Sequence, residues 1–223
     1  MPKNEKLRIL YWMYFFQKDK EHELFNLKHL ITYKGNALDV GCNLGLWTYG
    51  LSKQKKINKI ISFEPNKKIT KHIYEYNNKN IRTLHYGLSN KNDEKILNTP
   101  ICKEMALHGW SSFEKKKDFK KTFNKFIEIK SKVMKLDYFN FKNVSFIKID
   151  VEGHELKLLQ GAKKFFQINK PNCLIEISKM NLESVKIFFK SLNVNYKCIP
   201  KSKFNFKFTK ENFFFSINDF DKK

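Results

Sequence analysis

Arginine is almost absent from this chain. Of the 44 basic residues among 223, only Arg8 and Arg82 are arginine, and with 22 acidic residues the formal charge is +22. Proteins that read nucleic-acid sequence normally use the arginine fork on bases and phosphates, so this composition disfavours such a reader. The abundance of Lys, Asn, Ile and Phe is typical of AT-rich codon usage. A field of this sign still attracts anions. An anionic substrate, a membrane surface and a nucleic acid therefore all stay open as partners.

Paired cysteines and long apolar runs are missing too. The four cysteines, at positions 42, 102, 173 and 198, show no paired spacing, which favours reduced thiols and a cytoplasmic location. Residues 7–16 are apolar and aromatic but too short to span a bilayer, and no small-residue cleavage site follows them. They could lie on a membrane surface, although we favour a helix that covers one edge of a sheet. The length suits one domain with a sizeable core.

A glycine-bearing turn joins two apolar segments in the first third of the chain. Residues 37–45 read Ala-Leu-Asp-Val-Gly-Cys-Asn-Leu-Gly, and residues 60–65 read Ile-Ile-Ser-Phe-Glu-Pro. This order predicts a strand, a turn, a helix and a second strand ending in an acid, as in nucleotide-binding βαβ units. Asn43 and Leu44 stand where a pyrophosphate loop needs glycine and space. The turn therefore suits a nucleoside without phosphate, such as S-adenosylmethionine (SAM), with Glu64 accepting hydrogen bonds from its ribose hydroxyls.

A second block occupies residues 146–155, which read Phe-Ile-Lys-Ile-Asp-Val-Glu-Gly-His-Glu. It predicts a buried strand that ends at Asp150, followed by a helix. Together with the glycine turn it resembles the FkbM family of SAM-dependent methyltransferases over roughly residues 35–180. The matching segments, in order, are 39–45, 63–65, 87–90, 148–155 and 174–176. Cys42 departs from the family pattern, which usually has alanine there; both are small, so we expect no loss of binding.

The resemblance implies a class I SAM-dependent methyltransferase with a Rossmann-like α/β fold. We expect a doubly wound, mostly parallel seven-stranded sheet in residues 35–223, with residues 1–34 as an N-terminal helical extension. The resemblance also implies O-methylation of a hydroxyl on a sugar or glycan of the polysaccharide or lipopolysaccharide type. Two alternatives stay open, an RNA methyltransferase and a catalytically inactive SAM-binding module. An amino-methylating nucleic-acid enzyme is disfavoured, because residues 150–153 lack the Asn/Asp-Pro-Pro-aromatic tetrad.

Apolar periodicity places the remaining elements. We expect strands at 37–40, 60–63, 83–86, 126–136, 144–151 and 173–177, with a closing antiparallel pair at 196–199 and 213–217. We expect helices within 5–31 and at 46–53, 68–77, 154–166 and 182–192. The polar residues 91–100 indicate a hairpin or loop, and the lysine- and phenylalanine-rich residues 110–125 indicate a mobile cover.

The predicted site lies at the carboxyl ends of these strands, where open α/β sheets bind ligands. The cofactor-binding candidates are Asp39, Gly41, Asn43, Gly45, Glu64, Pro65, Gly87, Leu88 and Ser89. Asp150 is the first catalytic candidate, because it can orient the acceptor hydroxyl, take its proton or balance the sulfonium charge. His154 is the second, with a helix-capping role as the alternative. Substrate contacts are expected from His108, Trp110, Ser112, Glu152 and Glu176.

The same part of the sequence holds residues that can bind a metal ion. Asp150, Glu152, His154 and Glu176 offer oxygen and nitrogen ligands that suit a divalent cation. No compact ligand spacing demands an ion, so we predict none.

Overall fold

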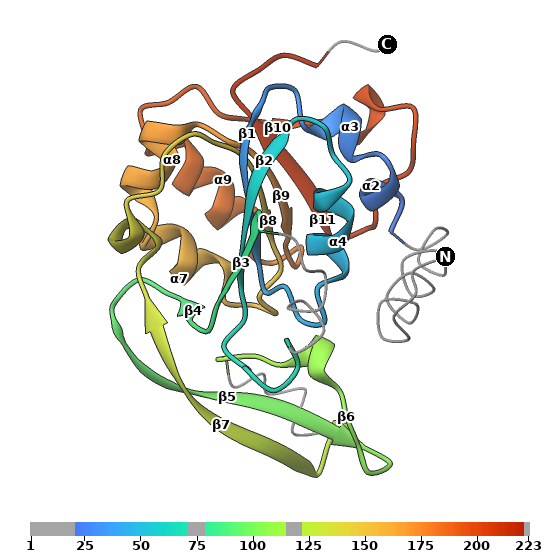
Figure 1. Cartoon of the computed structure of the whole chain (residues 1–223), viewed down its shortest axis with the longest axis vertical. Helices are drawn as coiled ribbons and strands as arrows, with labels where there is room; N and C mark the ends of the chain where they lie inside the picture. The colour runs from blue at the N-terminus through green and yellow to red at the C-terminus, as the bar shows by residue number, and fades with distance from the viewer. Residues whose placement is uncertain (1–20, 71–78, 115–121, 221–223) are drawn as a thin grey trace.

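The main sheet of the computed structural model has the strand order β10-β11-β9-β8-β1-β2-β3 (Figure 1). The structure describes residues 21–70, 79–114 and 122–220. The strands are β1 (Gly35–Val40), β2 (Ile57–Phe63), β3 (Ile81–Leu84), β8 (Val144–Ile149), β9 (Asn172–Glu176), β10 (Lys197–Ile199) and β11 (Asn212–Ser216). The first five of these run parallel, whereas β11 is antiparallel to both of its neighbours. The predicted seven-stranded, mostly parallel sheet is confirmed.

Helices cover both faces of this sheet (Figure 1). On one face lie α7 (Glu155–Gln160), α8 (Lys163–Asn169) and α9 (Leu182–Lys190), and on the other α2 (His22–Phe25), α3 (Leu27–Leu30) and α4 (Leu46–Ser52). Alternate residues of a strand point to opposite faces. Ile147 and Ile149 accordingly pack with Phe166, and Phe146 packs with Leu24 in the other apolar cluster. The doubly wound arrangement follows from this two-sided burial.

A second sheet, with the order β4-β7-β5-β6, lies below the carboxyl end of the main sheet in Figure 1. Its strands are β4 (Gly87–Leu88), β5 (Asp93–Cys102), β6 (Met105–Ala106) and β7 (Lys125–Met134). The polar residues expected to form a hairpin or loop at 91–100 thus belong mostly to strand β5. Much of β5 and β7 is exposed, and within residues 91–100 the buried residues are Leu97, Thr99 and Pro100. The expectation of a hairpin or loop was therefore partly wrong. A strand exposed to solvent has few apolar residues by which the sequence could reveal it.

The predicted helix at 154–166 is two helices, α7 and α8, separated at Gly161. A Cβ at Gly161 would overlap the carbonyl oxygen of Ser89, so the chain packs there without a side chain. The third strand begins at Ile81, two residues earlier than predicted. The apolar stretch 7–16, most of the helix predicted at 68–77 and residues 115–121 of the predicted cover lie outside the described residues.

The described part of the N-terminal extension shares a core with the sheet. Leu24, Leu27 and Leu30 are fully buried against the face that carries α4. The buried Glu23 accepts hydrogen bonds from Thr209 and from the side chain of Asn212, near the other end of the chain. A boundary at residues 34 and 35 stays a prediction. None of the helices in the described ranges has the length and apolar character needed to cross a bilayer.

Candidate active site

A cleft of about 420 Å³ opens at the carboxyl ends of β1, β2 and β8. Many of the predicted residues line it, namely Gly41, Asn43, Glu64, Pro65, Gly87, Leu88, His108, Trp110, Asp150, Glu152 and His154. The remaining predicted residues, Asp39, Gly45, Ser89, Ser112 and Glu176, are not in this lining. The lining also includes residues that the sequence analysis did not single out, among them Glu21, Trp47, Phe63, Tyr86 and Phe113.

Gly41 allows the turn and Asp150 to meet. Its φ is +80°, and a Cβ at this position would overlap the carbonyl oxygen of Asp150. The turn is fixed on its other side by the N–H groups of Gly41 and Cys42, which both donate to the carbonyl of Phe63. Glycine is the residue that tolerates this backbone conformation and this close approach. The cleft floor and the acid predicted to be catalytic are therefore in direct contact.

Glu64 occupies the end of β2 with only 6% of its surface exposed. Its Oε2 accepts the N–H of Asn43 at 3.1 Å and its Oε1 accepts the N–H of Asn66 at 2.9 Å. Burial raises the pKa of this carboxyl to about 7, although the two N–H donors oppose the rise. A carboxylate has about four lone-pair sites. These two hydrogen bonds therefore leave acceptor capacity for ligand hydroxyls.

Two polar atoms in the cleft lining are buried without a hydrogen-bond partner among the described residues: Asn43 Oδ1 and His108 Nδ1. Buried polar atoms are normally paired. An amine suits the Asn43 acceptor, and ribose hydroxyls suit Glu64. The partly exposed ring of Tyr86, which also lines the cleft, offers surface for a flat base. The residues present fit a nucleoside that carries an amino acid, as SAM does.

Asp39 lies beneath the glycine turn. It is 1% exposed and accepts a hydrogen bond from Thr48 of α4 at 2.5 Å, and Thr48 in turn contacts Ser62 at 2.7 Å. Burial raises the pKa of Asp39 to about 6. Asp39 faces α4 rather than the cleft. Gly45, with φ +87°, precedes the first residue of α4. Direct cofactor contacts by Asp39 and Gly45 stay predictions.

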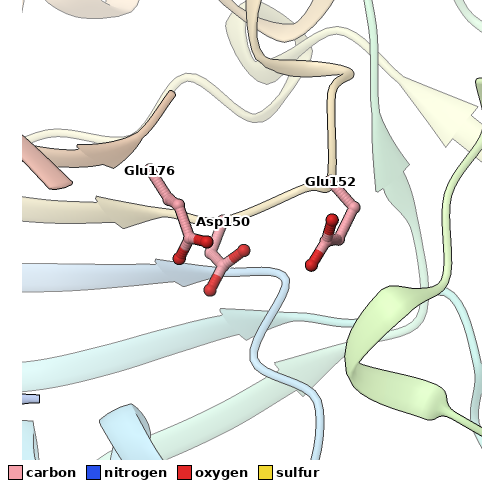
Figure 2. A group of neighbouring side chains, drawn as sticks. All are labelled: Asp150, Glu152 and Glu176. Carbon is pink, nitrogen blue, oxygen red and sulfur yellow. The ribbon is translucent and has the colours of Figure 1, made fainter. Parts of the chain in front are cut away.

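Three carboxylates meet beyond the glycine turn (Figure 2). Ile149 of β8 pairs with Ile175 of β9, so Asp150 and Glu176 follow at the same level. Glu152 comes from the loop that follows β8, and each of the three acids offers an oxygen within 4.8 Å of the others. Burial and the charge of Asp150 raise the pKa of Glu176. Three such oxygens could ligate a divalent cation. His154, the fourth candidate ligand in the sequence, instead contacts Glu114 and Ser89.

His154 precedes α7 and connects it with Ser89, which follows β4, and with Glu114. Its Nδ1 lies 2.6 Å from Glu114 Oε1 and its Nε2 lies 2.9 Å from Ser89 Oγ. Lys157 also reaches Glu114 Oε1, at 2.8 Å. Burial lowers the pKa of His154, and Glu114 opposes this shift. Because a carboxylate only accepts, a neutral ring carries its proton on Nδ1 and accepts from Ser89 on Nε2. Both ring nitrogens are thus engaged within the protein.

Ser112, like Glu114, connects its part of the chain to residues that follow β8. Its hydroxyl donates to the carbonyl oxygen of Glu152 at 2.7 Å and accepts the N–H of Glu114 at 3.0 Å. Residues 108–114, here called the closing segment, begin with the 3₁₀ helix η1 (His108–Trp110). Trp110 is 48% exposed and packs edge-on against Phe123. Ser112 thus holds the closing segment in place as part of the cleft lining, in which Trp110 is an exposed residue.

The strand order and the glycine turn at the carboxyl end of β1 define the fold of a class I SAM-dependent methyltransferase. The sequence model of the FkbM methyltransferase domain matches residues 39–205. The chain belongs to this methyltransferase family. The resemblance seen in the sequence is confirmed.

Several solved structures are similar to this chain. The FkbM methyltransferase from Methylobacillus flagellatus KT is 16% identical with a TM-score of 0.56, over 82% of this chain and 43% of that chain. The present chain thus spans less than half of that protein. An rRNA methylase from Streptococcus thermophilus is 10% identical (TM-score 0.47; 87% and 92% covered). The N-methyltransferase NodS from Bradyrhizobium japonicum WM9 is 6% identical (TM-score 0.43; 96% and 97% covered). No curated protein matches the chain.

Proposed function

We propose that this chain transfers the methyl group of SAM to a hydroxyl oxygen of a sugar or glycan. One observation carries the proposal: Gly41 brings the nucleoside-binding turn into contact with Asp150, so an acid stands at the end of the cleft. Methyl transfer needs the acceptor to be held in line with the donor, and most of its catalysis is positioning. A carboxylate in this place can orient a hydroxyl and remove its proton.

The roles of the residues follow from their contacts. SAM, when bound, supplies a methyl group whose bond to a positively charged sulfur breaks as the acceptor oxygen forms its new bond. Glu64 holds the ribose hydroxyls, and Asn43 Oδ1 accepts from the amine. Asp150 takes the proton that the acceptor hydroxyl loses. His154, whose ring nitrogens are both engaged, fastens the closing segment instead of acting on the acceptor.

The mouth of the cleft favours an acceptor that is uncharged where it reacts. Asp150 and Glu152 of the cleft lining, with Glu176 beside them, can accept hydrogen bonds from several neighbouring hydroxyls, as a sugar ring presents. The same acids repel a phosphate or carboxylate placed beside the reacting oxygen. The exposed indole of Trp110 offers an apolar surface with a polar edge to the face of such a ring. Anionic groups of a larger acceptor fit the lysine-rich exterior.

RNA methylation is the second candidate, and the formal charge of +22 favours it. Binding that rests on dispersed lysines weakens steeply with salt and does not depend on sequence. Titration of an RNA and a DNA duplex at low and physiological salt tests this. Tight, sequence-selective RNA binding at physiological salt would favour RNA over a glycan.

The test begins with calorimetry of SAM and S-adenosylhomocysteine on the purified protein. We expect both to bind, and no binding would reject the proposal. Methyl-labelled SAM is then offered with neutral oligosaccharides, anionic oligosaccharides, sugar nucleotides and RNA. We expect label on a sugar oxygen, identified by mass spectrometry, and a labelling rate lower by roughly 10²-fold or more with the Asp150→Asn variant. Label on RNA alone would replace the glycan proposal.

A further inference from the structure

Lys148 is a buried cation beneath the three carboxylates. It lies in β8 and is 1% exposed. Its Nζ is 3.5 Å from Asp150 Oδ2, 3.9 Å from Glu176 Oε2 and 5.2 Å from the centroid of a Trp47 ring. An ammonium in the protein interior is costly unless it is paired. The carboxylates of Asp150 and Glu176 are therefore its partners, and the indole of Trp47 covers it.

Further acids face Lys148 from the neighbouring elements. Asp39 of β1 is its register partner across the parallel β1–β8 pair. Glu21 lies behind Trp47, whose Nε1 donates to Glu21 Oε2 at 2.6 Å. Burial alone would lower the pKa of Lys148, but Asp150, Glu176, Glu21 and Asp39 raise it above its ordinary value. Lys148 is thus charged at neutral pH.

We propose that Lys148 is a positioning residue for methyl transfer, whose buried ammonium holds the carboxyl of Asp150 beside that of Glu176, in the place where Asp150 meets the acceptor hydroxyl. The catalytic part of this inference rests on the proposed function of Asp150. Two carboxylates this close repel each other, and a cation beside both offsets the repulsion. Without that cation, the pair would hold a proton to higher pH, and Glu152 on the other side would strengthen the effect. A protonated Asp150 cannot accept the proton of a hydroxyl.

A purely structural role for Lys148 predicts something different. Replacing a buried ion pair with an apolar side chain of similar volume is often neutral or stabilising. If Lys148 only fills space, Lys148→Met should leave the titration of the two acids unchanged. The titration of the carboxyls therefore separates positioning from packing, whatever happens to stability.

The experiment is a pH titration of the side-chain carboxyl carbons by NMR, on ligand-free wild-type protein and Lys148→Met. Asp150→Asn and Glu176→Gln assign the two signals. We expect the midpoints of the pair to move up by at least about one pH unit in Lys148→Met. The control is Lys130→Met. Lys130 forms an ion pair with Glu94 at 2.7 Å, and neither residue lines the cleft. This variant should leave the midpoints in place. Unchanged midpoints in Lys148→Met would overturn the proposal.

A second comparison tests the proposal if the Lys148→Met variant does not fold. The double variant Lys148→Met/Glu176→Gln removes the lysine together with one acid, and it is compared with Glu176→Gln alone. Asp150 should titrate at higher pH in the double variant; equal midpoints would overturn the proposal.

Calorimetry and turnover complete the test. SAM affinity should stay within about threefold in Lys148→Met, because Lys148 is not in the cleft lining. Turnover should fall at neutral pH and recover at higher pH. The NMR titration needs neither SAM nor acceptor, so failure of the proposed function and failure of this inference give different results.

Discussion

The backbone N–H of Asn43 donates a hydrogen bond to Oε2 of Glu64 at 3.1 Å, and so joins the glycine turn to the end of the next strand. The other carboxylate oxygen accepts the N–H of Asn66, which follows Pro65. Both oxygens are therefore fixed before any ligand arrives. The turn and the acid form one preorganised unit, and preorganisation reduces the entropy that binding must overcome.

The first prediction concerns pH and SAM affinity. The pKa of Glu64 is raised to about 7 by burial, so the carboxyl is mostly protonated at pH 6 and mostly ionised at pH 8. The ionised form accepts from ribose hydroxyls at both oxygens. We expect the Kd for SAM, measured by calorimetry, to tighten about tenfold from pH 6 to pH 8. Glu64→Gln should bind roughly 30-fold more weakly at pH 8, about 2 kcal/mol, and lose this pH dependence. Tighter wild-type binding at pH 6 would contradict the assignment.

The second prediction concerns Gly41. Gly41→Ala forces a side chain into a backbone with φ +80° and against the Asp150 carbonyl oxygen. We expect a loss of about 1–3 kcal/mol in the free energy of unfolding, together with weakened SAM binding. Gly109→Ala is the matched control in the same cleft, because a Cβ there has an ordinary contact of 3.5 Å with Asn43. Denaturant unfolding and calorimetry of both variants decide the matter. Equal behaviour of the two variants would show that the close approach is unimportant.

The third prediction concerns Asp150. Asp150→Asn keeps the shape of the side chain but removes the base. We expect kcat to fall by roughly 10²–10⁴-fold, with melting temperature and SAM affinity close to wild type. Glu152→Gln serves as the comparison, since we expect it to act mainly on the KM for the acceptor. Single-turnover rates with an identified acceptor give the measurement. Normal turnover of a folded, SAM-binding Asp150→Asn protein would remove Asp150 from catalysis.

The fourth prediction separates two roles of His154. A glutamine can donate to Glu114 and accept from Ser89, as the neutral imidazole does, but it cannot act as a base. If His154 fastens the closing segment, His154→Gln should keep kcat within about tenfold of wild type. His154→Ala should then weaken SAM binding and lower the melting temperature. Equal losses of kcat in both variants at unchanged SAM affinity would identify His154 as the base.

The sequence predicted the main sheet because its parallel strands are buried on both faces. Such strands read as apolar runs, and the chain between them must cross over through a helix. The same logic located Glu64 and Asp150, since an acid directly after a buried strand lies at the carboxyl edge of the sheet. The same logic did not predict strand β5, because its exposed polar residues resemble those of a loop.

The succession of most strands and helices along the chain, the glycine turn and the family were determined by the sequence itself, because each depends on local pattern and spacing. Only the tertiary structure decided which side chains share a site. It buried Lys148 between Asp150 and Glu176, although a lysine in an apolar run looks like an interruption. It placed Glu21 in the cleft lining and engaged both ring nitrogens of His154 with Ser89 and Glu114. These contacts join residues that are far apart in the chain, and the local sequence pattern around each residue does not specify which distant residue it will contact.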